Sequence, residues 1–155
     1  MDLVLDSGIL GKICHPLHPE NTPIARWIEG LLLRSATSVV VPEITDYELR
    51  RKLLHLVRFK GTWEARLSLD RLNEFVAQAR YLPLHSGVMH LAADLWATAR
   101  GTGQKTADDK ALDVDVILAA QALDCGSQVV TTNRKHLKRF VTVFDWEPHV
   151  RDGLL

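Results

Sequence analysis

The sequence predicts an α/β fold in which helices cover both faces of a central parallel sheet. Short apolar runs, rich in β-branched residues, alternate with longer segments of helical periodicity. One segment, residues 113–123, is apolar after Asp115 except for Gln121. A helix without a polar stripe is buried on most sides. The expected architecture is therefore a three-layer α/β/α single domain over residues 1–145, followed by a C-terminal tail over 146–155 without confident structure.

The first half of the chain predicts two strands, each followed by a helix. Leu3–Leu5 is a buried strand that stops at Asp6, and Asp6 or Ser7 opens a short helix. After a proline-containing loop, Thr22-Pro23 is a helix N-terminus, and the following apolar residues recur at helical spacing. Ser38–Val41 is a β-branched strand ended by Pro42.

The second half continues the alternation. Long helices are expected at about 43–60 and 63–80, then a weaker strand at 81–84, a helix from Ser86 to about Gly101, and a polar loop at 101–110. The buried helix follows, with Asp113 as its expected cap. The last expected elements are a strand at 128–131, a short helix capped by Asn133, and a strand at 141–144.

Composition excludes several classes of protein. The formal net charge is zero, so any binding of nucleic acid depends on local basic patches. The two cysteines, Cys14 and Cys125, do not have the spacing of a metal-binding motif and fit a reducing compartment. No apolar stretch reaches the ~18 residues of a membrane span, and no signal peptide is recognisable. The sequence therefore predicts a cytoplasmic protein without a membrane segment.

Three acidic residues are candidates for a metal site: Asp6, Glu48 and Asp115. Taken singly, each has an ordinary explanation, as a turn residue, a partner in an i, i+4 ion pair, or a complement to a helix dipole. Taken together they fit a hard divalent cation, because Mg²⁺ takes carboxylate, water and phosphate oxygens. Such an ion can acidify a water and stabilise a leaving oxygen without a protein nucleophile. No His-Glu-x-x-His motif or glycine-rich phosphate loop offers another chemistry.

The predicted strand ends offer a location for this site. Asp6 and the segment Thr131-Thr132-Asn133 both follow predicted strands. In open parallel sheets, sites form at the carboxyl ends of strands, near the point where the strand order reverses. Asp6 and Thr131 are therefore expected on the same edge of the sheet.

Four stretches of the chain resemble the PIN-domain family, most closely the VapC-type toxin ribonucleases of toxin–antitoxin pairs. In order, they are Val4–Leu10, Ile44–Arg50, Asp115–Ala120 and Val130–Leu137. The resemblance implies a PIN fold in which Asp6, Glu48 and Asp115 bind Mg²⁺ or Mn²⁺ and cut RNA. It also implies an antitoxin protein as partner and a homodimer.

Supporting residues follow from the last of these motifs. Thr131 lies at the strand end, and Asn133 stands where the family often has Asp or Asn. Asn133 can orient a water or a ligand but adds no charge. Members of the family commonly continue with Asp and Phe where this chain has His136 and Leu137, which leaves the number of metal ions open.

Two basic segments adjoin the motif residues. Leu49–Lys60 contains no acid, and Arg51 and Lys52 share a helix face with Glu48. Arg134 and Lys135 follow Asn133. Each segment is either a solvated surface or a positive rim that binds the RNA backbone. The tryptophans Trp27, Trp63 and Trp96 are expected in the core rather than as platforms for stacking bases, and an exposed one would suit antitoxin docking.

Two functions remain for such a chain. The first is a metal-dependent endoribonuclease, acting as the toxin of a type II toxin–antitoxin pair. The alternative, suggested by the neutral Asn133, is a catalytically weak PIN module that acts by binding RNA or protein. A phosphotransferase with an aspartyl nucleophile fits poorly, since Gly8 occupies the position of its expected second Asp.

Overall fold

Four parallel strands form one sheet, and the order of the strands places β1 in its interior. The strands are β1 (Asp2–Leu5), β2 (Ser38–Pro42), β3 (Arg80–Leu82) and β4 (Gln128–Val130), arranged β3-β2-β1-β4. The structure is a computed structural model and describes residues 1–15, 17–34, 36–102 and 108–153. The strand order reverses next to β1, because β2 and β3 lie on one side of it and β4 on the other.

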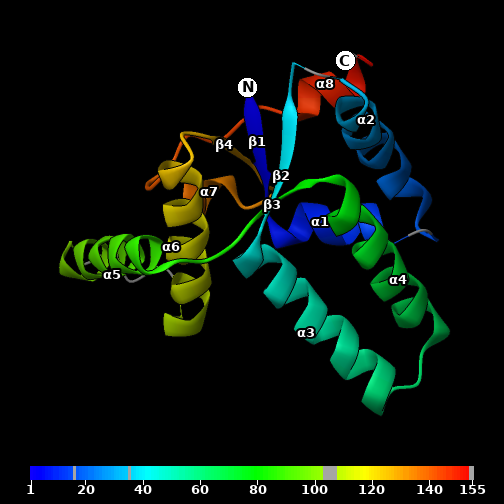
Figure 1. The fold of residues 1–155 in the computed structure, drawn as a ribbon, viewed down its shortest axis with the longest axis horizontal. Helices are drawn as coiled ribbons and strands as arrows, with labels where there is room; N and C mark the ends of the chain where they lie inside the picture. The colour runs from blue at the N-terminus through cyan, green and yellow to red at the C-terminus, as the bar shows by residue number, and fades with distance from the viewer. Residues whose placement is uncertain (16, 35, 103–107, 154–155) are drawn as a thin grey trace.

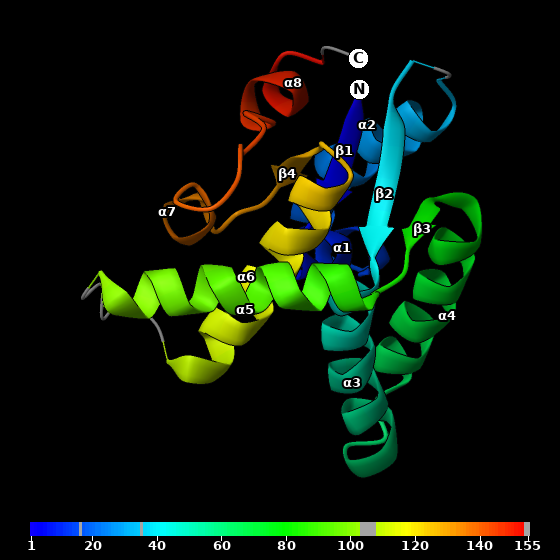
Figure 2. The same ribbon diagram turned by 60° about the vertical axis from the view of Figure 1, so that its left-hand side comes forward.

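Helices cover both faces of this sheet (Figure 1). They are α1 (Ser7–Cys14), the 3₁₀ turn η1 (Pro19–Asn21), α2 (Thr22–Leu32), α3 (Glu43–Phe59), α4 (Trp63–Gln78), α5 (Ser86–Gly101), α6 (Asp109–Asp124), α7 (Arg134–Leu137) and α8 (Glu147–Arg151). In Figure 2, α3 and α4 form a long hairpin that projects from the body of the fold. The predicted three-layer α/β/α architecture is confirmed.

Alternating residues of the strands fill two separate cores. Leu3 and Leu5 of β1 pack against α1, α2 and α4, whereas Val4 packs on the opposite face against α6. Helix α6 also packs against α5 through a third apolar cluster. It is therefore covered by the sheet on one side and by α5 on the other, as its apolar sequence predicts.

The single polar residue in the apolar part of α6 joins three elements. Gln121 is fully buried. Its Nε2 donates to the carbonyl of Leu82 at the end of β3 at 2.7 Å. Its Oε1 accepts from the backbone N–H of Ile44 in the first turn of α3 at 3.3 Å. Both backbone groups lie at element ends, where no ladder or helical partner is available, so the side chain of Gln121 fixes the start of α3 beside the sheet.

A second, partly buried network anchors α3 to its neighbours. Asp46 accepts from Nε of Arg50 at 3.1 Å and from the hydroxyl of Tyr81 on β3 at 3.2 Å. Arg50 also donates to Asn73 of α4 at 2.7 Å. Burial of Tyr81 and the charge of Asp46 raise the pKa of this tyrosine to about 12. The network holds the helix that carries Glu48.

Three sequence predictions of local structure are wrong. Residues 141–144 form only an isolated bridge, Val129 to Val143, because the chain leaves the sheet after two backbone hydrogen bonds to Val129. Helix α6 begins at Asp109 with Asp108 at the N-cap, so Asp113 is not the cap. The earlier start is favoured by Leu112, which is buried against α5. The expected polar loop thereby shrinks, and its residues 103–107 lie outside the described part of the chain.

The C-terminal segment is also more ordered than expected. Residues 147–151 form α8, which lies against α2. Phe144 stacks on Trp27 with ring centroids 6.0 Å apart, and His149 contacts both rings. Within the described residues, no helix is both long enough and apolar enough to cross a bilayer.

The hydrogen bonds of Gln121 give a prediction of stability. Gln121→Met keeps the size of the side chain but leaves the Leu82 carbonyl and the Ile44 N–H buried without a partner. We expect a loss of about 2–6 kcal/mol in the free energy of unfolding, from roughly 1–3 kcal/mol for each of the two unpaired groups. Urea denaturation followed by circular dichroism measures it. Gln78→Met, at an exposed position of α4, is the control; equal, small losses for the two variants would contradict this role.

Candidate active site

The side chain of Asp6 is fixed where β1 ends and α1 begins. One carboxylate oxygen, Oδ1, accepts from the backbone N–H of Ser7 at 2.6 Å and so caps α1. The other, Oδ2, accepts from the hydroxyl of Thr131 at 2.5 Å. Thr131 is fully buried and directly follows β4, the strand beside β1. The predicted meeting of Asp6 and Thr131 at one edge of the sheet is confirmed.

Close packing at this edge brings the two strand ends together. A Cβ atom on Gly8 would lie 3.2 Å from the hydroxyl oxygen of Thr132. This contact is tight, so glycine allows the start of α1 to approach the loop after β4. The distance between Asp6 and Thr131 depends on that approach.

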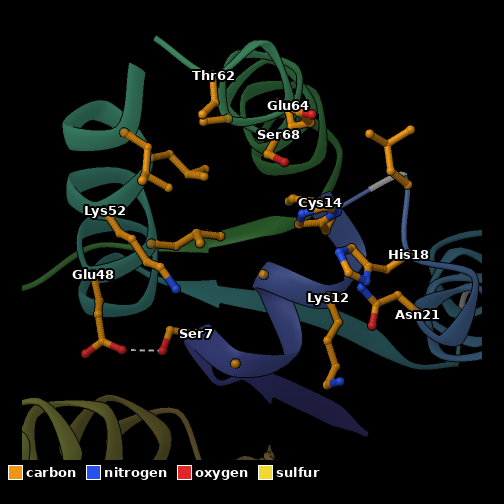
Figure 3. A pocket seen from close by; sticks show the side chains of 18 of the residues that line it. Ser7, Lys12, Cys14, His18, Asn21, Glu48, Lys52, Thr62, Glu64 and Ser68 are labelled. Carbon is orange, nitrogen blue, oxygen red and sulfur yellow. Dashed lines mark hydrogen bonds between the residues drawn. The ribbon is translucent and has the colours of Figure 1, made fainter. Parts of the chain in front are cut away.

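Glu48 reaches the same place from α3 by way of Ser7. The hydroxyl of Ser7 donates to Oε1 of Glu48 in a short hydrogen bond, drawn in Figure 3, and lies 3.5 Å from Oδ1 of Asp6. Ser7 therefore stands between two of the three predicted acids. Sequence reasoning treated Ser7 only as a possible helix start; its place immediately after Asp6 is the signal that could have identified it.

Asp115 on α6 brings a third negative charge. Burial, the Asp6 carboxylate and, as a smaller contribution, Glu48 together raise the pKa of Asp115 to about 6, while Arg139 opposes them. Burial also raises the pKa of Asp6, against the hydrogen bonds from Thr131 and Ser7. The three acids are therefore close enough for their charges to interact, although they come from three different elements.

This donor set suits a hard cation but is not a closed cage. Within the described residues, no three acidic, histidine or cysteine side chains are arranged to ligate one ion together. Mg²⁺ does not require this, because it commonly binds through one or two carboxylates and keeps several waters. Buried carboxylates whose charges repel one another are a suitable environment for a positive ion, since the ion offsets their repulsion.

The loop after β4 is held by the C-terminal segment. The indole N–H of Trp146 donates to the backbone carbonyl of Thr131 at 2.9 Å. Arg134 forms ion pairs with Asp145, at 2.7 Å, and with Glu147. The backbone N–H of Asn133 donates to the hydroxyl of Thr131 at 2.8 Å, while its own side chain is exposed and makes no capping bond. Nothing in the sequence pattern indicated the part played by Trp146.

The predicted RNA-binding residues divide into two kinds. Arg51, Lys52 and Lys135 are exposed. Arg134 is only partly exposed, and its ion pairs occupy the guanidinium, so contact with RNA would have to compete with Asp145 and Glu147. Three of the four residues therefore offer free surface charge beside the motif residues.

A groove leads away from the acidic group. Its volume is about 870 Å³, and it is lined by α1, residues 14–15 and 17–21, α3 and α4. Leu49, Leu53 and Ala65 contribute its apolar floor, and Lys12 and Lys52 stand at its rim. Figure 3 shows Ser7 and Glu48 at one end of the groove and Cys14, His18 and Asn21 at another. A polymer strand bound in this groove would lie directly beside the predicted metal site.

Comparison of the sequence with protein families identifies the chain. Residues 3–141 match the PIN domain. The chain therefore belongs to the PIN-domain family, and the resemblance recognised in its motifs is confirmed. Curated protein sequences give no significant match.

Solved structures with the same fold come from toxin–antitoxin proteins. A chain of VapBC2 from Rickettsia felis, bound to a DNA fragment from their promoter, has a TM-score of 0.71 at 15% identity, covering 95% of this chain and 100% of that one. A chain of FitAcB from Neisseria gonorrhoeae has a TM-score of 0.69 at 25% identity, and the match covers 94% of this chain and 99% of that one. A chain of VapBC-1 from nontypeable Haemophilus influenzae has a TM-score of 0.68 at 19% identity, and the match covers 94% of this chain and 98% of that one. These likenesses agree with a VapC-type PIN domain.

The raised pKa of Asp115 gives a prediction about pH. The carboxyl of Asp115 has a pKa of about 6 in the folded protein, above its ordinary 3.8. Its contribution to the free energy of unfolding is therefore fully present below pH 3.8 and is lost as the pH rises through about 6. Asp115→Asn cannot ionise, so we expect it to melt about 2–4 °C above the wild type at pH 7.5 and at the same temperature at pH 3.5. This corresponds to on the order of 1 kcal/mol, reduced for partial exposure.

Scanning fluorimetry in EDTA measures these shifts. Asp113→Asn is the matched control, because Asp113 is exposed on the same helix. Millimolar Mg²⁺ should then raise the melting temperature of the wild type more than that of Asp115→Asn, since binding to the folded state stabilises it. A shift that is independent of pH, or a wild type indifferent to Mg²⁺, would contradict the site.

Proposed function

We propose that this protein is a divalent-metal-dependent endoribonuclease and the toxin of a type II toxin–antitoxin pair. The observation that carries the proposal is the approach of Asp6, Glu48 and Asp115 at the edge of the sheet where the strand order reverses. Membership of the PIN-domain family and the likeness to VapBC and FitAcB chains support it. The two unbridged cysteines fit a cytoplasmic location.

The residues of the site have separate tasks in this proposal. Asp6 and Asp115, with Glu48, would hold Mg²⁺ or Mn²⁺, which supplies an acidified water and stabilises the leaving oxygen when bound. Thr131 holds one oxygen of Asp6, and Ser7 holds Glu48, so that both carboxylates face the substrate in fixed positions. Arg51, Lys52 and Lys135 would contact the phosphates of the RNA, and Asn133 would orient a water or a ligand.

The groove supports an antitoxin as the protein partner. A peptide could place apolar side chains on the floor formed by Leu49, Leu53 and Ala65, and its far end would reach Glu48. A bound segment would then cover the site and keep RNA out. The homodimer remains a prediction, and we carry it as part of this proposal.

The alternative is a PIN module that binds RNA or protein with weak or no cleavage. The observation that favours it is the neutral, exposed side chain of Asn133, which offers no fourth carboxylate. Three acids can hold one Mg²⁺, but a second ion would have to rely on the substrate's phosphate. The two proposals differ in whether RNA is cut.

Cleavage of a labelled single-stranded RNA across a Mn²⁺ titration tests the enzyme. We expect weak cleavage that grows with metal concentration, and a loss of at least tenfold in Asp6→Asn and Asp115→Asn because each removes a charged ligand. Asn133→Asp should shift the titration to lower Mn²⁺ by adding a charge. Asp113→Asn is the control and should cut like the wild type. Metal-independent cleavage, or none at any concentration, would favour the binding module.

Blocking the groove tests the antitoxin proposal. Gly11 lines the groove, and a Cβ there would lie 3.6 Å from a methyl of Leu49, which is ordinary contact. Gly11→Gln should therefore fold and place a side chain in the groove, whereas Gly11→Ala adds only one methyl. If a small DNA-binding protein is encoded in the neighbouring reading frame, we expect its affinity to fall at least tenfold with Gly11→Gln and little with Gly11→Ala. Equal affinity for both variants would place the partner elsewhere.

A further inference from the structure

An exposed line of aromatic and cationic side chains runs along α3, away from the site. Tyr47, Arg51, His55 and Phe59 follow one another at intervals of four residues, which places successive members side by side on a helix. The guanidinium of Arg51 lies 5.1 Å from the ring centroid of Tyr47, and the rings of His55 and Phe59 are 5.1 Å apart. We call these four residues the α3 stripe. It begins beside Glu48 and extends about 18 Å at 1.5 Å per residue.

The stripe and the neighbouring Trp63 leave large aromatic side chains exposed to solvent. Tyr47 is 55% exposed and Phe59 73%, and Trp63, just across the turn into α4, is 61% exposed. The expectation that Trp63 lies in the core is therefore wrong, because α4 turns its other face to the sheet. Neighbouring exposed aromatic rings are unusual on a soluble surface and mark places where a partner binds.

The charge around these rings is positive. Arg51, Arg58 and Lys60 are exposed, and residues 49–60 contain no acid. In the part of the chain that the structure describes, none of these three cations forms an ion pair with a carboxylate. In a chain of zero net charge, residues 49–60 are thus a locally positive segment.

We propose that the α3 stripe, continued by Trp63, is a track on which single-stranded RNA stacks its bases while Arg51, Arg58 and Lys60 hold its phosphates. The proposal rests on the proposed ribonuclease function and extends it to how substrate is held. It adds Tyr47, His55, Phe59 and Trp63 to the RNA-binding surface. The hairpin of α3 and α4 projects from the fold, so a strand lying on it can enter the site at Glu48 (Figure 2).

The chemistry of the surface favours RNA over a protein segment. Proteins that bind single strands combine a positive path for the backbone with aromatic side chains for the bases. Aromatic and cationic side chains lie together here along one helix, and the residues Tyr47, His55 and Phe59 are all exposed. A protein interface would instead favour a contiguous apolar centre with depleted charge.

Fluorescence anisotropy with a fluorescein-labelled 12-nucleotide single-stranded RNA, in EDTA to prevent cleavage, tests the track. We expect Phe59→Ala and Trp63→Ala each to weaken binding at least fivefold, the low end of the range for loss of one stacked base. Phe59→Tyr should restore wild-type affinity. Arg58→Ala should instead lower the slope of log Kd against log salt by about one, because one fewer counterion is released. Leu33→Ala, at the exposed end of α2, is the control.

A second probe isolates stacking. An RNA-length abasic strand carries the phosphates without bases, so Phe59→Ala should leave its affinity unchanged. In Mn²⁺, the same variant should raise KM for the 12-nucleotide RNA at constant kcat.

Three outcomes would overturn the track. Equal affinity of wild type and aromatic variants for RNA would remove it, while leaving cleavage in Mn²⁺ and the proposed function intact. An effect of Phe59→Ala that is equally large on the abasic strand would mean altered charge rather than stacking. If an aromatic variant changed from dimer to monomer in size-exclusion chromatography with light scattering while its RNA affinity stayed the same, the stripe would instead bind a second copy of the chain. A wild type that neither binds nor cuts RNA would refute the proposed function itself.

Discussion

The repulsion between Asp6, Glu48 and Asp115 is the constraint around which the carboxyl edge of the sheet is arranged. Burial and, to a smaller extent, the neighbouring like charges raise the pKa of Asp6 and of Asp115 and cost folding energy, so the fold has to supply compensation. Thr131 and the N-terminus of α1 provide hydrogen bonds to both oxygens of Asp6, and Ser7 provides one to Glu48. The burial of Gln121 and the Asp46 network hold α3 in place, although neither touches the site. The fold thus gives up some stability to hold the charged groups of the site in fixed positions, as many ligand-binding sites do.

Most of the fold could be predicted because its elements differ clearly in period. Val39–Val41 are apolar throughout and residues 116–122 are apolar except for Gln121, and they became a buried strand and a helix packed on two sides. The edge of the sheet that carries Asp6 and Thr131 followed from parallel topology alone. The errors lie where local sequence competes with tertiary contact. Asp113 is as good a cap as Asp108, and only the packing of Leu112 against α5 decides between them.

The site was predicted as a set of residue types and less well as a set of contacts. Asp6, Glu48 and Asp115 come together, but the bridging hydroxyl of Ser7 and the indole of Trp146 depend on distances that no single stretch of sequence encodes. Arg134 illustrates the opposite error. Its place after Asn133 suggested a free charge for RNA, yet Asp145 and Glu147, eleven and thirteen residues later, occupy it. The expectation for Trp63 failed for a similar reason. Helical spacing shows which residues share a face, but it does not show whether another element covers that face.

The bond from Trp146 to Thr131 links the order of synthesis to the state of the site. A chain is made from its N-terminus, so Asp6 leaves the ribosome 125 residues before Thr131. Strand β4 pairs directly with β1, and the indole that holds the carbonyl of Thr131 comes fifteen residues later still. Contacts of such sequence separation form late, because the long loop between them must close first. A nascent chain therefore carries its first acid without the neighbours that orient it until Thr131 and Trp146 have been made, and the centre is assembled only after that point.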